Sequence, residues 1–488
     1  MQLGHEITHS AGFGESTDST AHHKITYKAR HVTLAVPSYE PGIDDSDMST
    51  WTNHIRFVQV EPALDHTAKT QFKGSKDLAS KIAMAYLESP LSERDGMKIE
   101  TNDWMHKEEF QNMDHAADGK KKFKLTAEWK EEVICEDLGE KAMDEMDADE
   151  IMQAMLSIPQ EDIDAAHAKN PNELISAATK LLERKLGKAV LDALGEDEQK
   201  CLVGLLFAGC GGNKDLNSFK YGVLKMNRTW ETAGRPPPVL LANKANDTVI
   251  QLGEEADSAA VQRAVDSSSR GGVKLVSLAG ALFNHKSEEQ GYQDVHRMFM
   301  AKHKKEKHGI TNNKKFPDSS NTRYQSHSYG SAELVTFLNL YNELLEVTWD
   351  SKKQAGFNHL EQNVAKGLED APTLTEMVAM SLYGVSVLWP YLNIVCGAGG
   401  KVVNLLDPDI IDLHRRLPAF CDYIAENPRL LLDATANDNF SKITLDGETW
   451  RDEMLIMSTQ ILASELPDLE LMISAMFSGS ADGWRQFT

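Results

Sequence analysis

The first third of the chain carries two stretches in which apolar and polar residues alternate, followed by a stretch with helical spacing. Residues 25–36 (ITYKARHVTLAV) and 54–60 (HIRFVQV) alternate with a period of two, and a turn-rich segment separates them. This alternation is typical of strands with one buried face. Residues 67–87 carry apolar side chains at helical spacing and end before Pro90. Strands followed by an amphipathic helix predict an α/β or α+β domain.

The rest of the chain has mostly helical patterns. Residues 120–200 are helical and acidic, and Asn170 followed by Pro171 marks a helix start inside them. Later in the chain, an apolar run at 273–283 precedes helix-like stretches at 332–347, 373–388 and 454–466. We therefore expect two domains. Residues 1–240 form an α/β core with a helical insert at about 120–200, and residues 241–488 form a mostly α-helical domain.

The composition describes an acidic, soluble, globular chain. Of its 488 residues, 51 are Lys or Arg and 74 are Asp or Glu, which gives a formal net charge of −23, and 41% are hydrophobic. A chain of this length is expected to hold about two to four domains. The negative charge opposes nonspecific attraction to a phosphate backbone, so nucleic-acid binding would need a local basic patch or a metal ion.

We expect neither a membrane span nor a disulfide framework. Residues 377–400 carry no charge, but they include Pro390, and a buried helix broken near Trp389 and Pro390 explains them better than a span. The five cysteines are scattered and form no C-x-x-C pair, which favours a reducing compartment, nuclear or cytoplasmic. The first residues lack the basic flank and apolar run of a secretory signal.

Two segments place an aspartate where metal chemistry could use it. Residues 15–21, ESTDSTA, contain Asp18, and on composition this segment is a turn ahead of the first strand pair. Residues 114–124, DHAADGKKKFK, begin with Asp114. This carboxylate is either a ligand for Mg²⁺, which prefers hard oxygen ligands, or the cap of the helix that follows. The residues of this segment alone favour neither of these two interpretations over the other.

Two further segments combine polar, basic and aromatic residues. Residues 208–222, AGCGGNKDLNSFKYG, hold Cys210 and Asn213, which would suggest a metal half-site if the asparagine were a histidine; a lone buried cysteine usually belongs to a core. Residues 301–321 form the most basic loop of the protein, and an Arg and a Tyr follow it within FPDSSNTRYQSH, residues 316–327. Such a segment can hold a phosphate backbone or stack a base, although a helix cap beside a solvated loop is the simpler explanation in isolation.

Taken in order, these segments resemble the sequence blocks of hAT-type DNA transposases. D-H-A-A-D is similar to the D-N-A-x-N block around their second catalytic aspartate. C-G-G-N-K-D-L-N is similar to their C-x-x-H-x-L-N block, and T-R-Y-Q-S to their T-R-W-x-S block. Almost the whole chain resembles, more closely, a group of long proteins from mushroom-forming fungi that carry versions of the same blocks.

The resemblance implies an RNase H-like fold, a mixed sheet with helices in residues 1–240, joined to a large, mostly α-helical insertion or C-terminal region. It implies Asp18 and Asp114 as the catalytic ligands of Mg²⁺ or Mn²⁺, and metal-dependent cleavage and strand transfer of DNA as the ancestral reaction of a mobile element. DNA is the expected partner, and a homo-oligomer is left open. Six basic residues would contact the DNA backbone: Lys302, Lys304, Lys305, Lys314, Lys315 and Arg323.

Three departures from the family pattern predict that this chain is incomplete or inactive. Ser19 stands where the first block has a glycine. Asn213 replaces the histidine of the C-x-x-H block and cannot act as an imidazole base or ligand. The N-E-G block, which carries the third acidic residue, is not found in this sequence, which ends at Thr488.

Other acidic residues could replace the missing third acid, and other functions are possible for the chain. Glu376 is explained as the third residue of a capping box opened by Thr373, and Glu333 and Glu361 look like surface charge. The alternative function is a non-enzymatic intracellular interaction protein that keeps the RNase H-like fold. A weaker third hypothesis is a metal phosphohydrolase built on the Asp-His pairs at 65–66 and 114–115.

Overall fold

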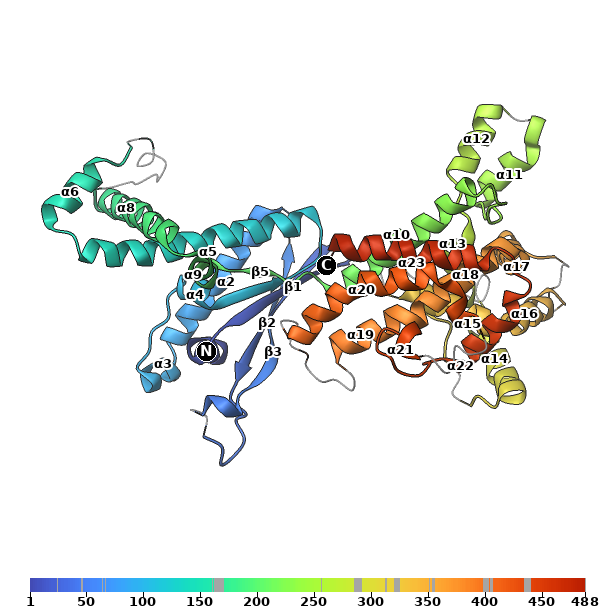
Figure 1. Cartoon of the computed structure of the whole chain (residues 1–488), viewed down its shortest axis with the longest axis horizontal. Helices are drawn as coiled ribbons and strands as arrows, with labels where there is room; N and C mark the ends of the chain where they lie inside the picture. Colours follow the sequence, from blue (N-terminus) through green and yellow to red (C-terminus); the bar gives the residue numbers. More distant parts are fainter. Residues whose placement is uncertain are drawn as a thin grey trace. The chain divides into compact units, whose positions relative to one another are not determined.

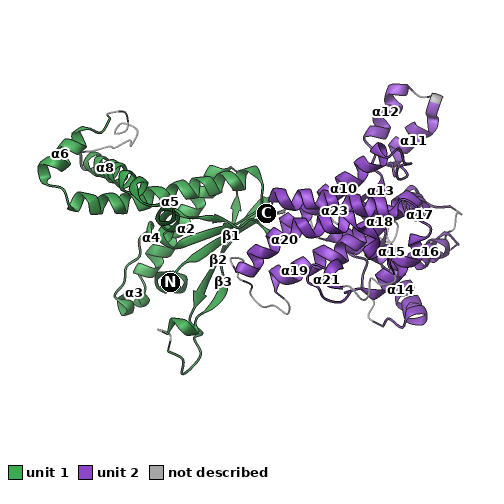
Figure 2. Cartoon of the chain, in the orientation of Figure 1, with its two compact units in different colours: residues 1–210 green, residues 211–488 purple. Residues whose placement is uncertain are grey.

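The chain folds into two compact units, Met1–Cys210 (unit 1) and Gly211–Thr488 (unit 2), shown in separate colours in Figure 2. The computed structural model describes all residues except 24, 45–46, 64, 66, 160, 162–170, 256, 285–291, 312–313, 320–324, 351, 353–355, 398–402, 404–406, 434–439 and 488. The units meet in sequence before α10 (Gly211–Thr232), earlier than the expected residue 240. The reason is that α10 packs along α23 (Leu469–Phe487) inside unit 2.

Unit 1 is a mixed α/β domain built on a five-stranded sheet (Figure 1). Its strands are β1 (Phe13–His22), β2 (Ile25–Val36), β3 (Thr52–Ala63), β4 (Glu108–Asn112) and β5 (Leu206–Phe207). They lie in the order β3-β2-β1-β4-β5. β2 is antiparallel to both β1 and β3, whereas β4 is parallel to β1 and β5 is parallel to β4. Both strands predicted from alternation are present, so the coarse α/β class is confirmed.

Helices cover one face of this sheet. The helices of unit 1 are α1 (Gln2–His9), α2 (Ala68–Leu87), α3 (Pro90–Asp95), α4 (Asp103–Lys107), α5 (Ala117–Asp144), α6 (Ala148–Leu156), α8 (Pro171–Ala193) and α9 (Glu196–Val203). Val32 and Leu34 of β2 form a buried cluster with Leu78 of α2 and Trp129 of α5. The predicted helix at 67–87 is therefore α2, and Thr67 caps it by accepting a hydrogen bond from the Thr70 backbone N–H.

The helical segment expected at 120–200 lies on α5, α6, α8 and α9. Two glycines let α5 and α8 approach closely. A Cβ atom on Gly139 of α5 would lie 1.9 Å from the Glu183 carbonyl oxygen, and one on Gly187 of α8 would lie 1.8 Å from the Cys135 carbonyl oxygen. No other residue fits at these distances, so the two glycines fix the contact between the helices.

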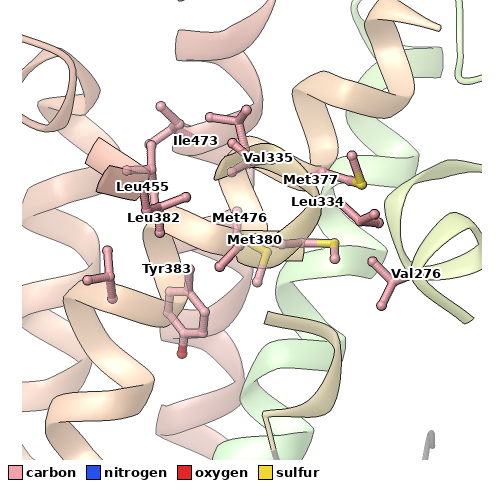
Figure 3. Packing of buried hydrophobic residues seen from close by; sticks show 14 of the residues in the cluster. Val276, Leu334, Val335, Met377, Met380, Leu382, Tyr383, Leu455, Ile473 and Met476 are labelled. Atoms are coloured by element: carbon pink, nitrogen blue, oxygen red, sulfur yellow. The ribbon is translucent and has the colours of Figure 1, made fainter. Parts of the chain in front are cut away.

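Unit 2 is helical throughout its described residues. Besides α10 and α23 it contains α11 (Lys244–Leu252), α12 (Ser258–Asp266), α13 (Gly271–Phe283), α14 (Gln293–His308), α15 (Ser326–Thr336), α16 (Leu338–Asp350), α17 (His359–Glu369), α18 (Ala371–Tyr383), α19 (Trp389–Cys396), α20 (Pro408–Glu426), α21 (Phe440–Ile443) and α22 (Glu453–Ala463). Its core is apolar, and Leu382, Met380 and Met476 are fully buried in it (Figure 3).

Two sequence predictions in unit 2 differ from the structure. The stretch expected as one helix at 332–347 is divided between α15 and α16, which meet at Phe337. The segment expected as a loop at 301–321 is helical up to His308, because α14 continues to the left-handed Gly309, a usual helix end.

The apolar segment at 377–400 lies on a continuous helical path, Ala371–Cys396. The expected break near Trp389–Pro390 is instead a π-helical stretch, Gly384–Leu388, that joins α18 to α19. Pro390 lies in the first turn of α19, where a missing N–H is tolerated. By length and composition this path could cross a membrane, but 83% of its most apolar window is buried inside the protein.

Candidate functional site

Asp18 lies inside β1, not in a turn. The hydroxyl-rich segment around it pairs with β2 residue by residue, and Asp18 stands opposite Ala29. The turn predicted from composition is therefore wrong, because antiparallel pairing with β2 takes up the backbone hydrogen bonds that a turn would have used. The Asp18 side chain is exposed, and its Oδ1 accepts a hydrogen bond of 2.7 Å from the Ser19 backbone N–H.

Asp114 follows β4 by two residues and is also exposed. Its Oδ1 accepts a hydrogen bond of 3.1 Å from the Ala116 backbone N–H, just before α5 begins. This bond comes from the N-cap residue Ala116 itself, so Asp114 is not the cap of α5 that one of the two interpretations expected. Asp114 nevertheless lies just after the end of β4, as a metal ligand at a strand end would.

The two aspartates lie just beyond the paired part of two neighbouring strands. β1 and β4 are parallel, with Glu15 opposite Gln111 and Ser16 opposite Asn112 as the last pairs of the register. Asp18 and Asp114 each come two residues after this last pair, Asp18 within β1 and Asp114 after the end of β4. Neighbouring strands lie about 4.8 Å apart, a spacing at which two carboxylates can share one cation.

A third ligand is missing from this pair. Among the residues that the structure describes, no third His, Cys, Asp or Glu forms a close ligand group with Asp18 and Asp114. Two carboxylates alone hold Mg²⁺ weakly, because the ion gives up its waters reluctantly. The arrangement can therefore attract a divalent cation but does not enclose one.

The acids considered as substitutes are all engaged within unit 2. Glu376 is buried and accepts hydrogen bonds of 2.8 Å from both the Trp230 indole N–H and the Gly272 backbone N–H. The capping box predicted for it is wrong, because Asp370 caps α18. Glu361 is buried beside Lys352, and Glu333 binds Lys304 and Tyr341, so neither is a free surface charge.

The residues of the third sequence block belong to different units. Cys210 ends unit 1, and its backbone N–H donates a 2.7 Å hydrogen bond to the Met113 carbonyl, next to Asp114. Asn213 lies in the first turn of α10, in unit 2, and is half-buried.

The hypothesis of a metal phosphohydrolase depends in part on the pair Asp65 and His66. Asp65 accepts hydrogen bonds from Thr67 and Thr70 at the start of α2, and His66 lies outside the described residues.

The six basic residues predicted to bind DNA do not form one surface. Lys302 and Lys305 are exposed on α14, and Lys314 and Lys315 are exposed in the segment that follows it. Arg323 lies outside the described residues. Lys304 is buried instead: its ammonium lies 2.5 Å from a Glu333 carboxylate oxygen and 3.8 Å from the centre of the Phe337 ring. It serves the packing of α14 and is not available to a phosphate.

Lys314 and Lys315 line an open cavity of about 550 Å³ in unit 2. Tyr329 and Trp389 are stacked at its wall, with ring centres 4.6 Å apart and planes only 6° from parallel. Arg451 adds a third cation to the lining and also pairs with Asp446. Of the two rings only Tyr329 is exposed, at 44%, since Trp389 is buried, and the acidic residues Glu333 and Asp452 also line the cavity. An exposed aromatic ring beside cations can stack a base and contact a phosphate.

A buried network of charges lies beneath β1, on the face of the sheet that the helices cover. Glu15 is fully buried and receives hydrogen bonds from Arg30 at 2.7 Å, from Lys122 at 3.2 Å and from Ser75 at 3.2 Å. Burial alone would raise the pKa of Glu15. The positive charges of Lys122 and Arg30 outweigh this effect and lower the pKa to about 2. Glu15 is therefore ionised and offsets part of the positive charge of the two buried cations beside it.

Glu108 is a second fully buried carboxyl in the same network. Burial, together with the negative charge of Glu15, raises its pKa to about 8. Its Oε1 accepts a 2.8 Å hydrogen bond from Gln111, and its backbone carbonyl accepts one of 2.5 Å from Lys130. No local sequence pattern indicates this pair, because Glu15 and Glu108 are far apart in the chain.

Comparison of this chain with family models, with curated proteins and with solved structures finds no match. Its function must therefore be argued from the sequence blocks and from the geometry of the described residues. Of the predicted site residues, Asp18 and Asp114 lie on or just after the neighbouring strands β1 and β4, and Lys314 and Lys315 line one cavity.

Proposed function

We propose that the chain is a transposase-derived protein whose unit 1 is an RNase H-like domain, that it binds DNA, and that it does not cleave it. The observation that carries this proposal is that Asp18 and Asp114 each come two residues after the last paired residues of the parallel strands β1 and β4. Three successive antiparallel strands, a helix, and a strand parallel to the first one are also the arrangement expected of an RNase H-like sheet.

The absence of cleavage follows from the composition of the pair. In a two-metal phosphodiester reaction the ions must stabilise both the attacking and the leaving oxygen. If Mg²⁺ or Mn²⁺ is bound, Asp18 and Asp114 would hold it, but no third acidic ligand joins them within the described residues. Asn213 also lacks the imidazole found in the related sequence block.

DNA binding is assigned to unit 2. Lys314, Lys315 and Arg451 can contact phosphates, and the exposed ring of Tyr329, backed by buried Trp389, can take a base. These are local features of a chain with a net charge of −23, so binding should weaken steeply as the salt concentration rises.

Two assays on the full chain test the proposal. Fluorescence anisotropy with labelled single- and double-stranded DNA should show binding that Lys314→Glu/Lys315→Glu weakens at least tenfold. The control Lys244→Glu/Lys366→Glu makes the same charge change at other exposed lysines of unit 2 and should weaken binding much less. Absence of binding, or equal loss in the control, would overturn the DNA-binding part.

The second assay measures nicking of labelled duplex with Mg²⁺ or Mn²⁺. The wild type and Asp114→Ala should give the same background. Cleavage by the wild type that Asp114→Ala removes would overturn the claim of inactivity and establish a nuclease. Cleavage that persists in Asp114→Ala would show that another site is responsible.

One observation favours the alternative, a non-enzymatic interaction protein that keeps the fold. The edge strand β3 exposes Ile55, Phe57 and Val60, each more than half accessible to solvent. An apolar edge strand of this kind can bind an added strand from a partner. This function is preferred if the chain binds no DNA in the first assay.

A further inference from the structure

His5, His9 and Asp95 form a compact group in unit 1, away from the sequence blocks discussed above. His5 and His9 lie one turn apart on α1, and Asp95 is the last residue of α3. One potential ligand atom from each of the three lies within 4.8 Å of the other two. All three side chains are partly buried, and the two imidazole rings have their centres 4.4 Å apart.

The hydrogen bonds of the two histidines determine which nitrogens are available. His5 Nδ1 lies 2.6 Å from Asp95 Oδ2, and His9 Nδ1 lies 2.9 Å from the His5 carbonyl oxygen. A carboxylate and a carbonyl only accept, so both Nδ1 atoms carry the proton. In the neutral rings both Nε2 atoms then hold a lone pair, which is the form of imidazole that binds a metal.

A neighbouring arginine supports this assignment for His5. Arg94 Nη2 lies 3.5 Å from His5 Nε2, and a guanidinium can only donate, so Nε2 is the acceptor. The Arg94 side chain is 62% exposed and can swing into solvent when an ion takes its place.

Asp95 is prepared for a role beside a metal-bound imidazole. It accepts hydrogen bonds from His5, from Tyr86 at 2.9 Å and from Arg94 at 3.0 Å. A carboxylate that receives Nδ1–H of a ligating histidine orients the ring and raises its basicity, an arrangement that recurs at metal centres.

We propose that His5, His9 and Asp95 form a binding site for one transition-metal ion of the Zn²⁺, Ni²⁺ or Cu²⁺ class. His5 and His9 would supply Nε2 atoms, Asp95 would hold His5 or ligate directly, and water would complete the coordination. Imidazole nitrogens favour these ions over Mg²⁺, so this site is distinct in chemistry from the pair Asp18 and Asp114.

The three side chains lie close enough together to reach one metal ion after reorientation. Two ligand nitrogens at about 2.0–2.1 Å from Zn²⁺ in tetrahedral geometry lie about 3.3 Å apart. One potential ligand atom of each residue lies within 4.8 Å of the other two, and reorientation of the side chains would have to bring the two Nε2 atoms to this separation. A bound ion would tie the first helix of the chain to α3.

The test uses the full chain, first treated with a chelator. Zn²⁺ binding is measured by competition with a chromogenic chelator, for the wild type, His5→Gln, His9→Gln and Asp95→Asn. We expect each histidine variant to weaken one Zn²⁺ site at least tenfold, and Asp95→Asn to weaken it by about 10- to 100-fold. The matched control is His106→Gln, since His106 also lies between carboxylates, Asp103 and Asp137, but has no second histidine beside it.

Cu²⁺ electron paramagnetic resonance gives a readout that a merely structural role would not change. The wild type should show two imidazole nitrogens bound to the ion, and each single histidine variant should show one. Far-UV circular dichroism in chelator checks that the variants are folded. Equal Zn²⁺ affinity in the wild type and His5→Gln/His9→Gln, or equal loss in His106→Gln, would overturn the site. Because nicking and DNA binding do not enter these measurements, the outcome is independent of the proposed function.

Discussion

The interiors of the two units differ in the charge they hold. In unit 1, a buried ion network lies beside the apolar cluster between the sheet and its covering helices: Glu15, Arg30 and Lys122 are almost completely removed from solvent, and Glu15 pairs with both cations. In unit 2, the corresponding interior is made of Leu, Met and aromatic side chains, and a buried acid such as Glu376 stands among neutral donors.

This difference predicts different kinds of sensitivity. Removing one member of a buried ion network leaves the others unpaired in a medium of low dielectric constant, so the loss exceeds that of the contact itself. An apolar core instead loses free energy in proportion to the volume removed, without regard to charge or pH. Unit 1 should therefore respond to changes in charge and pH, and unit 2 to changes in volume.

The largest effect is expected from Glu15→Gln. It leaves Arg30 and Lys122 buried without their counter-charge and should lower the free energy of unfolding of unit 1 by about 3–5 kcal/mol. Urea unfolding followed by hydrogen–deuterium exchange of α2 and α5 measures this locally. Glu61→Gln is the matched control, because Glu61 also faces Arg30, at 3.6 Å, but is 38% exposed. The added change Lys122→Met should recover part of the loss, and a double variant less stable than Glu15→Gln would contradict the network.

The next effect is a change of volume in unit 2. Leu382→Ala opens a cavity among fully buried side chains and should cost about 3 kcal/mol, measured by urea unfolding with exchange read on α18 and α23. Because no charge is involved, the cost should be the same at pH 5 and pH 8. Ile461→Ala, at a position 69% exposed, is the control and should cost under about 1 kcal/mol. A strong pH dependence of the Leu382 variant would break the comparison between the units.

The strand that carries part of this network shows what the sequence can predict. The alternation in ITYKARHVTLAV predicts a strand at the bounds that β2 has, Ile25–Val36. With a period of two, Lys28 and Arg30 fall on the same face as Val32 and Leu34, and all four are buried. The partner that makes this favourable, Glu15, lies on another strand, and nothing in the local pattern of β2 indicates it.

The candidate sites show the same limit. The D-H-A-A-D block predicts an aspartate at a strand end, and Asp114 lies there. The turn expected around Asp18 is wrong, because composition reports local hydrogen bonding and not pairing with β2. The group of His5, His9 and Asp95 was missed. The H-x-x-x-H spacing at 5–9 was the available signal, but Asp95 comes 90 residues after His5.

A smaller, pH-dependent effect is expected from Glu108→Gln. The folded-state pKa of about 8 lies above the unfolded value of 4.5, so the native state binds the extra proton between these pH values and loses stability as the pH rises through them. The variant should match the wild type near pH 5 and be more stable at pH 8, by at least about 1.4 kcal/mol, one pKa unit. Urea midpoints at both pH values measure this. Glu109→Gln, the exposed neighbour, should show no such change, and a gain that is equal at both pH values would refute the linkage.

The smallest effect should come from Glu376→Gln, the counterpart of Glu108 in unit 2. Both carboxyls are buried, and burial raises the pKa of each. The two oxygens of Glu376 accept hydrogen bonds from Trp230 and Gly272. Glu108, in contrast, lies near the negative charge of Glu15. An amide keeps one acceptor and turns its NH₂ toward the other donor, which should cost about 1–2 kcal/mol at pH 5. Because the raised pKa makes the native wild type bind a proton more readily than the unfolded chain, this cost should shrink as the pH rises. Urea unfolding at pH 5 and pH 8 measures this cost. A variant more stable than the wild type at pH 5 would contradict stabilising hydrogen bonds from Trp230 and Gly272 to this carboxyl. Glu376 would then behave as Glu108 does.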